Sequence, residues 1–423
     1  MSCDRILSTV YKCTKKQQIM TNNAKLKKTS IEQLLNRGVA EVLPNKKSLA
    51  NLMNQRSIKL YLGIDPTGAL LHLGHAVVLR KLQQFAELGH EVILLIGNGT
   101  VKIGDPTGRD ESRPVLTDEE IEKNWKNWKE QASTILDFSM IKVLHNGDWL
   151  DQLNYSDIVK LLAKTTVQQL LERDMFQERL KQGKPIHGHE IIYPLLQGYD
   201  SVVMNVDLEL GGTDQTFNMM MGRTLQKAYN NHEKWVLTTP IINGTDGRKM
   251  SKSFNNFVAL TEDEKQMYGK LMSVNDELIV EYLTLLTDLS IDEIKEIELK
   301  LQAGENPMEY KKKMAFAITA DLHSETEAKK AQEHFERTVQ GNEIPTDVQT
   351  IKINSQQIRV LDLLNTCNPS QSNAQLKRLC EQGGVKILPN GEILKDPQEI
   401  INISDDFILK IGKRSFYKIQ IEQ

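Results

Sequence analysis

The chain changes from a strand to a helix within the sequence Tyr61-Leu62-Gly63-Ile64-Asp65-Pro66-Thr67-Gly68-Ala69-Leu70-Leu71-His72-Leu73-Gly74-His75. Apolar residues alternate before this loop, as in a strand, and repeat with helical spacing after it. His75 stands where the predicted helix begins. Unpaired backbone N–H groups and the helix dipole favour an anion there, and the imidazole donors make phosphate the expected anion. The sequence therefore predicts a nucleotide-binding loop at the carboxyl end of a strand.

Two motifs resemble the signatures of class I aminoacyl-tRNA synthetases. His72-Leu73-Gly74-His75 matches their His-x-Gly-His pattern, which pantetheine-phosphate adenylyltransferases and related nucleotidyltransferases carry too. The second signature lies far downstream, as Lys249-Met250-Ser251-Lys252-Ser253. Either motif can arise by chance, whereas both in this order, a domain's length apart, are specific.

Further segments resemble the tyrosyl-tRNA synthetases of bacterial type. Their strand and loop place a tyrosine before the glycine and Asp-Pro-Thr after it, as Tyr61 and Asp65-Pro66-Thr67 do here. Tyr193-Pro194-Leu195-Leu196-Gln197-Gly198-Tyr199-Asp200 resembles their tyrosine-binding helix, and Gly211-Gly212-Thr213-Asp214-Gln215 resembles their Gly-Gly-Ser/Thr-Asp-Gln loop. With Gly104-Asp105-Pro106-Thr107-Gly108 between them, the resemblance runs from about residue 31 to the C-terminus.

Length and composition set bounds on the protein. A chain of 423 residues favours two or three domains. The formal net charge is −3, so any nucleic-acid contact must come from local basic patches. The four cysteines have neither a metal-binding spacing nor a disulfide pattern, which favours a reduced cytoplasm. The apolar run Val92–Ile96 is far too short to cross a bilayer, so no membrane association is expected.

The expected fold class is α/β: a Rossmann-like catalytic domain with a parallel sheet, then an α-helical domain, then a small α+β RNA-binding domain. The expected boundaries are a basic extension at 1–30, a catalytic domain at 31–260 with an insertion at about 115–190, a helical anticodon-side domain at 261–340, a linker at 341–355 and the small domain at 356–423. Within the insertion, helical patterns fill 118–138 and 156–182 around a strand at 141–144. The extension reads as a solvated tail or, alternatively, as an organelle-targeting peptide, and Met20 is a second possible start.

Three features that could belong to a functional site could also have a purely structural role. Tyr193, Gln197 and Asp200 share one helix face, which solvent alone could cover. Their apolar neighbours indicate burial instead, and buried polar groups need a partner such as a ligand. Asp105 could merely cap a turn, and Asp214 a helix. His187-Gly188-His189-Glu190 invites a metal reading, but His-x-His alone is no ligand set, so no metal site is expected.

The resemblance to tyrosyl-tRNA synthetases implies a role for each candidate residue. The catalytic residues would be His72, His75, Thr67, Lys249 and Lys252. Tyrosine would be bound by Tyr61, Asp105, Tyr193, Gln197, Asp200 and Gln215, with Tyr61 and Asp200 at its phenolic hydroxyl. ATP would be bound by Asp65, Gly74, Gly212, Asp214, Met250, Ser251 and Ser253. RNA would be bound by the small domain through Lys377, Arg378, Lys413 and Arg414.

The same resemblance implies the reaction and the partners. ATP with Mg²⁺ would activate L-tyrosine, and the tyrosyl group would then pass to the 3′ end of its tRNA, with no other cofactor. The insertion would form a homodimer interface, since Leu161, Leu162, Val167, Leu170 and Leu171 are too many apolar residues for a solvated helix face. Alternatives are a tryptophanyl-tRNA synthetase, an RNA-binding or splicing protein derived from a synthetase, and a small-molecule nucleotidyltransferase.

Overall fold

The computed structural model describes the residues 30–68, 70–107, 116–251, 254–340, 348–353, 355–369, 371–388, 391–403, 405–412 and 415–421. The basic extension lies outside these ranges, and so do four predicted site residues: Lys252, Ser253, Lys413 and Arg414. The described chain divides into two compact units. The first comprises the described parts of Met1–Glu262 and Val274–Pro307, and the second those of Asp263–Ser273 and Met308–Gln423.

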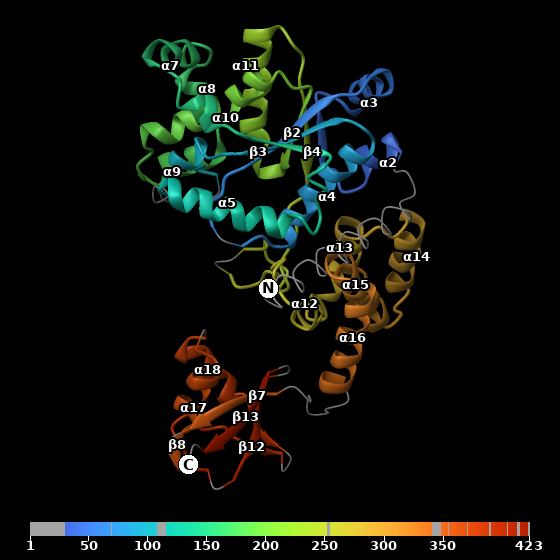
Figure 1. Ribbon diagram of the computed structural model, residues 1–423, viewed down its shortest axis with the longest axis vertical. Helices are drawn as coiled ribbons and strands as arrows, with labels where there is room; N and C mark the ends of the chain where they lie inside the picture. The colour runs from blue at the N-terminus through green and yellow to red at the C-terminus, as the bar shows by residue number, and fades with distance from the viewer. Residues whose placement is uncertain are drawn as a thin grey trace, which may run out of the picture. The chain divides into compact units, whose positions relative to one another are not determined.

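The first unit is built on one six-stranded sheet (Figure 1). Its strands are β1 (Glu41–Leu43), β2 (Lys59–Ile64), β3 (Glu91–Ile96), β4 (Ile141–His145), β5 (Leu208–Gly212) and β6 (Trp235–Thr239). Their order is β1-β6-β5-β2-β3-β4, and all neighbours are parallel except β1, which is antiparallel to β6 at the edge. The predicted parallel-sheet fold is confirmed.

The central strands are buried on both faces, because helices cover each side of the sheet. On one face Tyr61, Ile93 and Leu95 pack with Met204 at the end of α10 (Gly188–Met204). On the other, α4 (Leu73–Glu87) follows β2 and packs on β3 and β5. In Figure 1, strands β2, β3 and β4 lie between α10 and α11 (Thr216–Asn230) on one side and α4 and α5 (Asp118–Ala132) on the other. The carboxyl ends of β2, β3 and β5 consequently meet at one edge, where such sheets bind ligands.

Helices fill the rest of the first unit. They are α2 (Ile31–Asn36), α3 (Lys46–Gln55), α4 (Leu73–Glu87), α5 (Asp118–Ala132), α6 (Gly147–Leu150), α7 (Tyr155–Leu162), α8 (Val167–Leu171), α9 (Asp174–Lys181), α10 (Gly188–Met204), α11 (Thr216–Asn230), α13 (Ile279–Leu286) and α14 (Ile291–Gln302), with short 3₁₀ turns η1 (Thr100–Lys102), η2 (Thr213–Gln215) and η3 (Asp276–Leu278). The helical pattern predicted over 156–182 is in fact three short helices. Thr166 divides the first two, because its hydroxyl accepts from the backbone of Gln169 and caps a new helix.

Two glycines let α10 and α11 cross closely. A Cβ at Gly198 would lie 3.0 Å from the backbone nitrogen of Gly222 and 2.9 Å from the Leu225 side chain. Side chains at this crossing would therefore push the helices apart. The close packing fixes the helix that carries Gln197 and Asp200 against the rest of the unit.

Residues 274–307 pack with the first unit, although the sequence analysis placed them in a separate helical domain. Arg37, at the end of α2, donates to four backbone carbonyls at the end of α13 and just beyond it: Leu283, Thr284, Thr287 and Leu289. Arg80 of α4 also donates to Asp288 at 2.5 Å. One guanidinium thus satisfies carbonyls that a helix end leaves unpaired, and it ties this segment to the sheet domain.

The second unit begins with helices. They are α12 (Glu264–Leu271), α15 (Pro307–Leu322) and α16 (Glu325–Phe335), followed by a π-helical turn η4 (Glu336–Gln340). Tyr268 of α12 packs against Phe335 of α16, with ring centroids 5.7 Å apart.

The C-terminal part of the second unit has its own apolar core. Its elements are β7 (Gln349–Ile353), β8 (Gln357–Arg359), α17 (Val360–Cys367), α18 (Asn373–Glu381), β9 (Val385–Leu388), β10 (Glu392–Ile393), β11 (Ile400–Asn402), β12 (Phe407–Ile411) and β13 (Ser415–Ile421). The sheets have the orders β10-β9-β12-β13-β7 and β11-β8. Residues 349–353, predicted as linker, instead form strand β7, which is parallel to β13. Ile353 of this strand packs in the core.

Candidate active site

The two histidines of the first signature bond each other's backbone at the start of α4. His72 is the N-cap: its Nδ1 accepts from the N–H of Gly74 at 3.1 Å, while Nδ1 of His75 accepts from the N–H of His72 at 3.2 Å. A neutral imidazole that accepts at Nδ1 carries its proton on Nε2. Both rings, with centroids 4.1 Å apart, therefore carry N–H donors at a helix N-terminus that favours anions.

The chain that follows the second signature runs beside the histidine loop. The N–H of Leu73 donates to the carbonyl of Val258 at 3.0 Å, and the N–H of Leu260 donates to the carbonyl of Leu71 at the same distance. The ring of Phe257 lies 5.9 Å from that of His72. The two distant signatures are thus joined through backbone contacts a few residues beyond the second one.

Lys249 of the second signature points toward η2. Its Nζ lies 3.3 Å from Oδ2 of Asp214, and both side chains are accessible to solvent. This ion pair is therefore weak, and Lys249 could leave Asp214 to bind a phosphate.

Asn256 fastens the loop that carries Lys249, and the sequence analysis did not single it out. Its Nδ2 contacts Oδ1 of Asp246 at 2.7 Å and the carbonyls of Arg248 and Lys249 at 3.3 and 3.2 Å. Its Oδ1 accepts from the N–H of Ser251 at 2.9 Å. Because Asn256 is only 2% exposed, these bonds define the loop conformation without competition from water.

A row of polar groups joins the carboxyl ends of the strands to α10 and η2. Asp65, just after β2, accepts from the Tyr193 hydroxyl at 2.8 Å and from the Thr100 hydroxyl at 2.7 Å. Asp105 accepts from Nε2 of Gln215 at 2.8 Å. Oδ1 of Asp105 accepts from the backbone N–H of Thr107 at 3.0 Å, so Asp105 also caps a turn. Four predicted ligand-binding residues therefore lie in two bonded pairs.

Tyr61 and Asp200 are buried deeper, at 0% and 2% exposure. The Tyr61 hydroxyl shares a hydrogen bond of 3.0 Å with the hydroxyl of Ser201. Asp200 accepts from Nδ2 of Asn146 at 3.1 Å and from Nε1 of Trp149 at 2.8 Å. Burial raises the pKa of Asp200 well above its usual value, and these two donors act against that rise.

A buried ion pair lies behind these groups. Lys234, just before β6, bonds Glu209 of β5, and both side chains are almost completely excluded from solvent. Gln197 donates from Nε2 to the other carboxylate oxygen of Glu209 at 3.2 Å. Burial, and then the charges of Glu209 and Asp200, raise the pKa of Tyr61 well above its usual value.

Four other predicted residues are placed by their backbones. A Cβ at Gly74 would lie 2.9 Å from the His72 ring, and one at Gly212 would lie 2.7 Å from Oδ1 of Asp214, so a side chain at either position would displace that neighbour. Met250 is buried, and its N–H donates to the carbonyl of Ile242. The N–H of Thr67 donates to the carbonyl of Asp65 at 2.8 Å.

Neither a metal cluster nor a membrane span is found in the described part of the chain. His187 and His189 stack with centroids 5.6 Å apart, but they belong to no group of three or more potential ligands among these residues. No helix in the described ranges has the length and apolar character to cross a bilayer.

Comparisons with known proteins agree with this arrangement. The family model described as tRNA synthetases class I (W and Y) matches residues 53–340. The tyrosine–tRNA ligase of Thermotoga maritima is 45% identical over 389 residues, which cover 92% of this chain and 96% of that protein. The tyrosine–tRNA ligase of Aquifex aeolicus is 42% identical, with 92% and 97% covered. The chain belongs to the class I tyrosyl-tRNA synthetases.

A solved structure supports the fold of this synthetase independently. The C-terminally truncated mitochondrial tyrosyl-tRNA synthetase of Coccidioides posadasii superposes with a TM-score of 0.59, covering 78% of this chain and 98% of its own. Its sequence identity of 22% means that this likeness concerns the fold alone.

The predicted RNA-binding residues of this synthetase divide into two groups. Lys377 and Arg378 are exposed on α18, which Ser372 caps as expected. Lys413 and Arg414 lie outside the described residues.

Replacing Asn256 by Ala should loosen the loop of the second signature. The variant loses the four side-chain hydrogen bonds from Asn256 to residues 246–251, so trypsin should cut after Arg248 and Lys249 several-fold faster. Mass spectrometry of timed digests measures this. Asn54→Ala, which removes a single bond within α3, is the control. Equal cleavage rates in the two variants would contradict the role given to Asn256.

Proposed function

We propose that this synthetase activates L-tyrosine with ATP, releasing pyrophosphate, and then transfers the tyrosyl group to the 3′ end of tRNA(Tyr). The tyrosine carboxylate attacks the α-phosphate of ATP, and a terminal tRNA hydroxyl later attacks the mixed anhydride. Neither step needs an enzyme nucleophile. Catalysis therefore rests on positioning the reactants and on stabilising the negative charge that grows on the phosphates.

The buried pair Tyr61 and Asp200 supports tyrosine as the substrate more than any other observation. Both groups are buried, and both can bond a phenolic hydroxyl in addition to their partners within the chain. Phenylalanine would bury them against a ring that offers no further hydrogen bond, which costs binding free energy relative to tyrosine. The hydroxyl of tyrosine pairs them, so the site selects for it.

The amino and carboxylate groups of tyrosine fit the outer part of the row. Tyr193, Gln197 and Asp105 would hold the ammonium group, since Asp105 supplies a negative charge and the other two supply oxygens. Gln215, which bonds Asp105, would orient the carboxylate toward the α-phosphate. These contacts place the nucleophile near the histidine loop.

The phosphates of ATP would be bound from two sides. Nε2–H groups of His72 and His75, with Thr67, would donate on one side. Lys249 and Lys252 would supply positive charge on the other, and lysine suits this task because its flexible stem can follow the departing pyrophosphate. Mg²⁺ would enter with ATP, held mainly by phosphate oxygens and water.

The remaining ATP contacts follow from the backbone geometry. Gly74 and Gly212 leave space for the nucleotide to approach, Asp214 would bond the ribose, and Asp65 would line the adenylate site. The last contacts would come from the second signature, at Met250, Ser251 and Ser253.

tRNA would be contacted by the second unit. The exposed basic pair Lys377 and Arg378 stands on a helix of a small separate core, and such residues bind phosphates without sequence preference. Lys413 and Arg414 would extend this contact.

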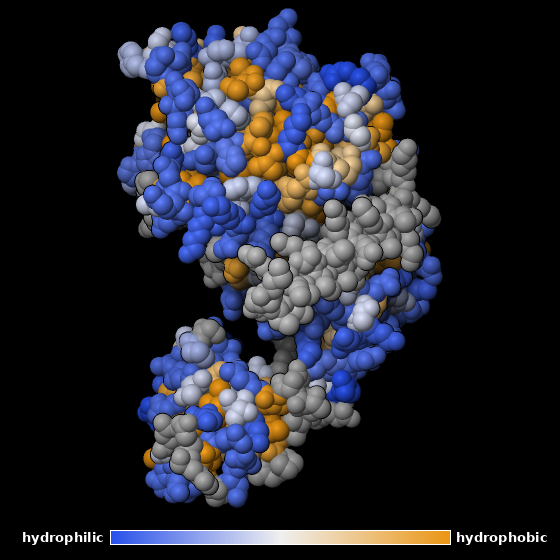
Figure 2. All heavy atoms as spheres, in the orientation of Figure 1, coloured by the Kyte–Doolittle hydropathy of each residue, from blue (hydrophilic) through white to orange (hydrophobic). Residues whose placement is uncertain are grey.

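A homodimer is the proposed assembly, through the insertion. Leu161 and Leu170, which the sequence analysis assigned to a partner surface, instead pack against α10 in the chain's own core. Val159 and Val167 are 45% and 60% exposed, and Tyr155 is 85% exposed. Figure 2 shows further apolar surface where Figure 1 places α10 and α11. Contiguous apolar surface of this kind favours a protein partner.

Charge at the insertion should dissociate the dimer. Val159→Asp with Val167→Asp should shift the sedimenting species from dimer to monomer, because burying carboxylates in an apolar interface is unfavourable. Sedimentation velocity measures the shift. Leu299→Asp, at a 67% exposed position on α14, is the matched control and should remain dimeric. A wild-type protein that sediments as a monomer would refute the proposed assembly.

Amino-acid-dependent exchange between ATP and labelled pyrophosphate tests the proposed function. Tyrosine should support exchange, while tryptophan and phenylalanine should be nearly silent, because they leave the phenol-binding groups unpaired. Exchange driven by tryptophan would favour a tryptophanyl enzyme. No exchange with any amino acid would favour an RNA-binding protein that has lost activation.

Trp149→Phe should weaken tyrosine binding in a pH-dependent manner. The loss of the indole N–H raises the pKa of Asp200 further, so less of the carboxylate that accepts the phenol is present. The KM for tyrosine should rise about tenfold, as expected for one hydrogen bond to a charged group. Since the ionised fraction grows with pH, the defect should shrink as the pH of the assay is raised. Trp125→Phe, which loses the same volume without contacting Asp200, should show neither effect.

A further inference from the structure

Glu209 and Lys234 form an ion pair that lies almost entirely out of contact with water. The side chain of Lys234 is 0% exposed and that of Glu209 is 2% exposed. Buried ion pairs rarely repay the cost of removing both charges from water, so stability alone is a weak reason for this one. The neighbours that the pair holds in place are a stronger reason for it.

All three N–H donors of Lys234 are used. They reach Glu209, the Ser201 hydroxyl at 2.8 Å and the carbonyl of Met219 at 3.1 Å. An ammonium group with three fixed acceptors has one orientation. It also lies 5.7 Å from the centroid of the Tyr61 ring, within the range of a cation–π contact.

Gly222 of α11 supplies the space for this ammonium group. A Cβ at position 222 would lie 2.5 Å from Nζ of Lys234, 2.7 Å from Oγ of Ser201 and 3.3 Å from Oε2 of Glu209. Any side chain there would displace the ion pair. The close crossing of α10 and α11 and the buried charge thus depend on the same glycine.

The two ends of the pair reach opposite ends of the tyrosine site. At one end, Glu209 accepts from Gln197, which faces the proposed ammonium position. At the other, Lys234 donates to Ser201, which bonds the hydroxyl of Tyr61. The ion pair therefore links Gln197, proposed for the ammonium group, to Ser201 and Tyr61 at the phenol end through consecutive hydrogen bonds.

Lys234 also balances negative charge that is buried around the proposed tyrosine site. Two buried carboxylates, Asp200 and Glu209, lie near one another, since the charge of Glu209 raises the pKa of Asp200. Lys234 is the cation bonded to this group among the described residues. Without it, the deep end of the site would hold two carboxylates with no compensating charge.

We infer that the Glu209–Lys234 pair is a positioning device for the amino-acid half of the active site, which fixes Gln197 and Tyr61 together and sets the affinity for tyrosine. This inference rests on the proposed function. It assigns no contact with ATP to either residue, so the two substrates should respond differently when the pair is broken.

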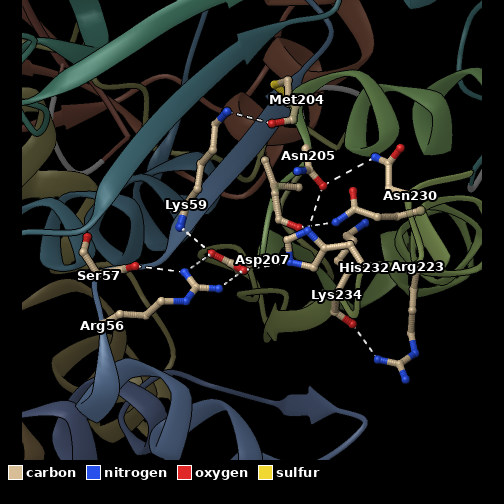
Figure 3. Close-up of polar contacts among 12 residues, drawn as sticks. Arg56, Ser57, Lys59, Met204, Asn205, Asp207, Arg223, Asn230, His232 and Lys234 are labelled. Atoms are coloured by element: carbon tan, nitrogen blue, oxygen red, sulfur yellow. Dashed lines mark hydrogen bonds and ion pairs between the residues drawn. The ribbon is translucent and has the colours of Figure 1, made fainter.

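A neighbouring ion pair on the same strands provides a matched control. Arg56 bonds Asp207 through two hydrogen bonds, at 2.8 and 2.6 Å, and His232 bonds the same carboxylate at 3.0 Å (Figure 3). Asp207 lies two residues before Glu209 in the chain, and His232 lies two residues before Lys234. This second group ties the strand ends together but touches none of the proposed tyrosine-binding residues.

The experiment measures KM for tyrosine and for ATP in pyrophosphate exchange by the full chain, with thermal unfolding of each variant. Lys234→Met should raise KM for tyrosine at least about tenfold and KM for ATP less than about twofold, because one buried charge is left unpaired next to Gln197. The double variant Glu209→Gln with Lys234→Met removes both charges at similar volume. It should raise KM for tyrosine less than Lys234→Met does, because no unpaired charge is left. Gly222→Ala should resemble Lys234→Met. Arg56→Met should lower thermal stability with both KM values unchanged.

The outcomes separate the inference from the function on which it rests. Wild-type protein without tyrosine-dependent exchange would refute the proposed function itself. An active wild type whose folded variants keep a normal KM for tyrosine, or lose affinity for both substrates equally, would overturn the positioning role. If Lys234→Met fails to fold, Gly222→Ala carries the same test, with the same expected rise in KM for tyrosine.

Discussion

Charge that is held away from water is the constraint on which the active site depends. Asp200 lies at 2% exposure with a raised pKa, and the role proposed for it, binding a phenolic hydroxyl, needs its carboxyl group in a defined state. Asn146 and Trp149 donate to it and favour the ionised form. Lys234 and Glu209 lie nearby and bond Ser201 and Gln197, so buried polar groups hold one another in place here.

The parallel sheet explains why residues so far apart in sequence share this network. Strands β2, β3 and β5 end at the same edge, and their loops carry Asp65, Asp105 and Asp214. Helix α10 crosses behind them and contributes Tyr193, which bonds Asp65 directly. In the proposed function the sheet holds the amino acid, while the second signature lies on a loop to which Asn256 supplies four side-chain hydrogen bonds. This division suits a reaction in which one substrate is held and pyrophosphate must leave.

The sequence predicted the parallel sheet and the family, because strands buried on both faces and complete motifs leave clear patterns. The roles of Tyr61, Asp200 and the two histidines remain predictions from those motifs. The sequence did not predict Glu209 or Lys234, since a single charge inside an apolar strand, or just before one, has no local pattern that names its partner. Asn146 and Asn256 were missed for the same reason: their bonds depend on tertiary contacts. The strand at 349–353 was taken for a linker because it is a short edge strand whose pairing partner lies more than sixty residues later in the chain.

A crystal structure with a non-hydrolysable tyrosyl-adenylate analogue tests the central claim most directly. The account predicts that the phenolic oxygen lies within hydrogen-bonding distance of both Tyr61 and Asp200, with the ammonium group at Asp105 and Gln197 and the phosphate mimic beside His72 and His75. A ligand whose phenol binds away from Asp200, or whose phosphate mimic lies far from the two histidines, would contradict it.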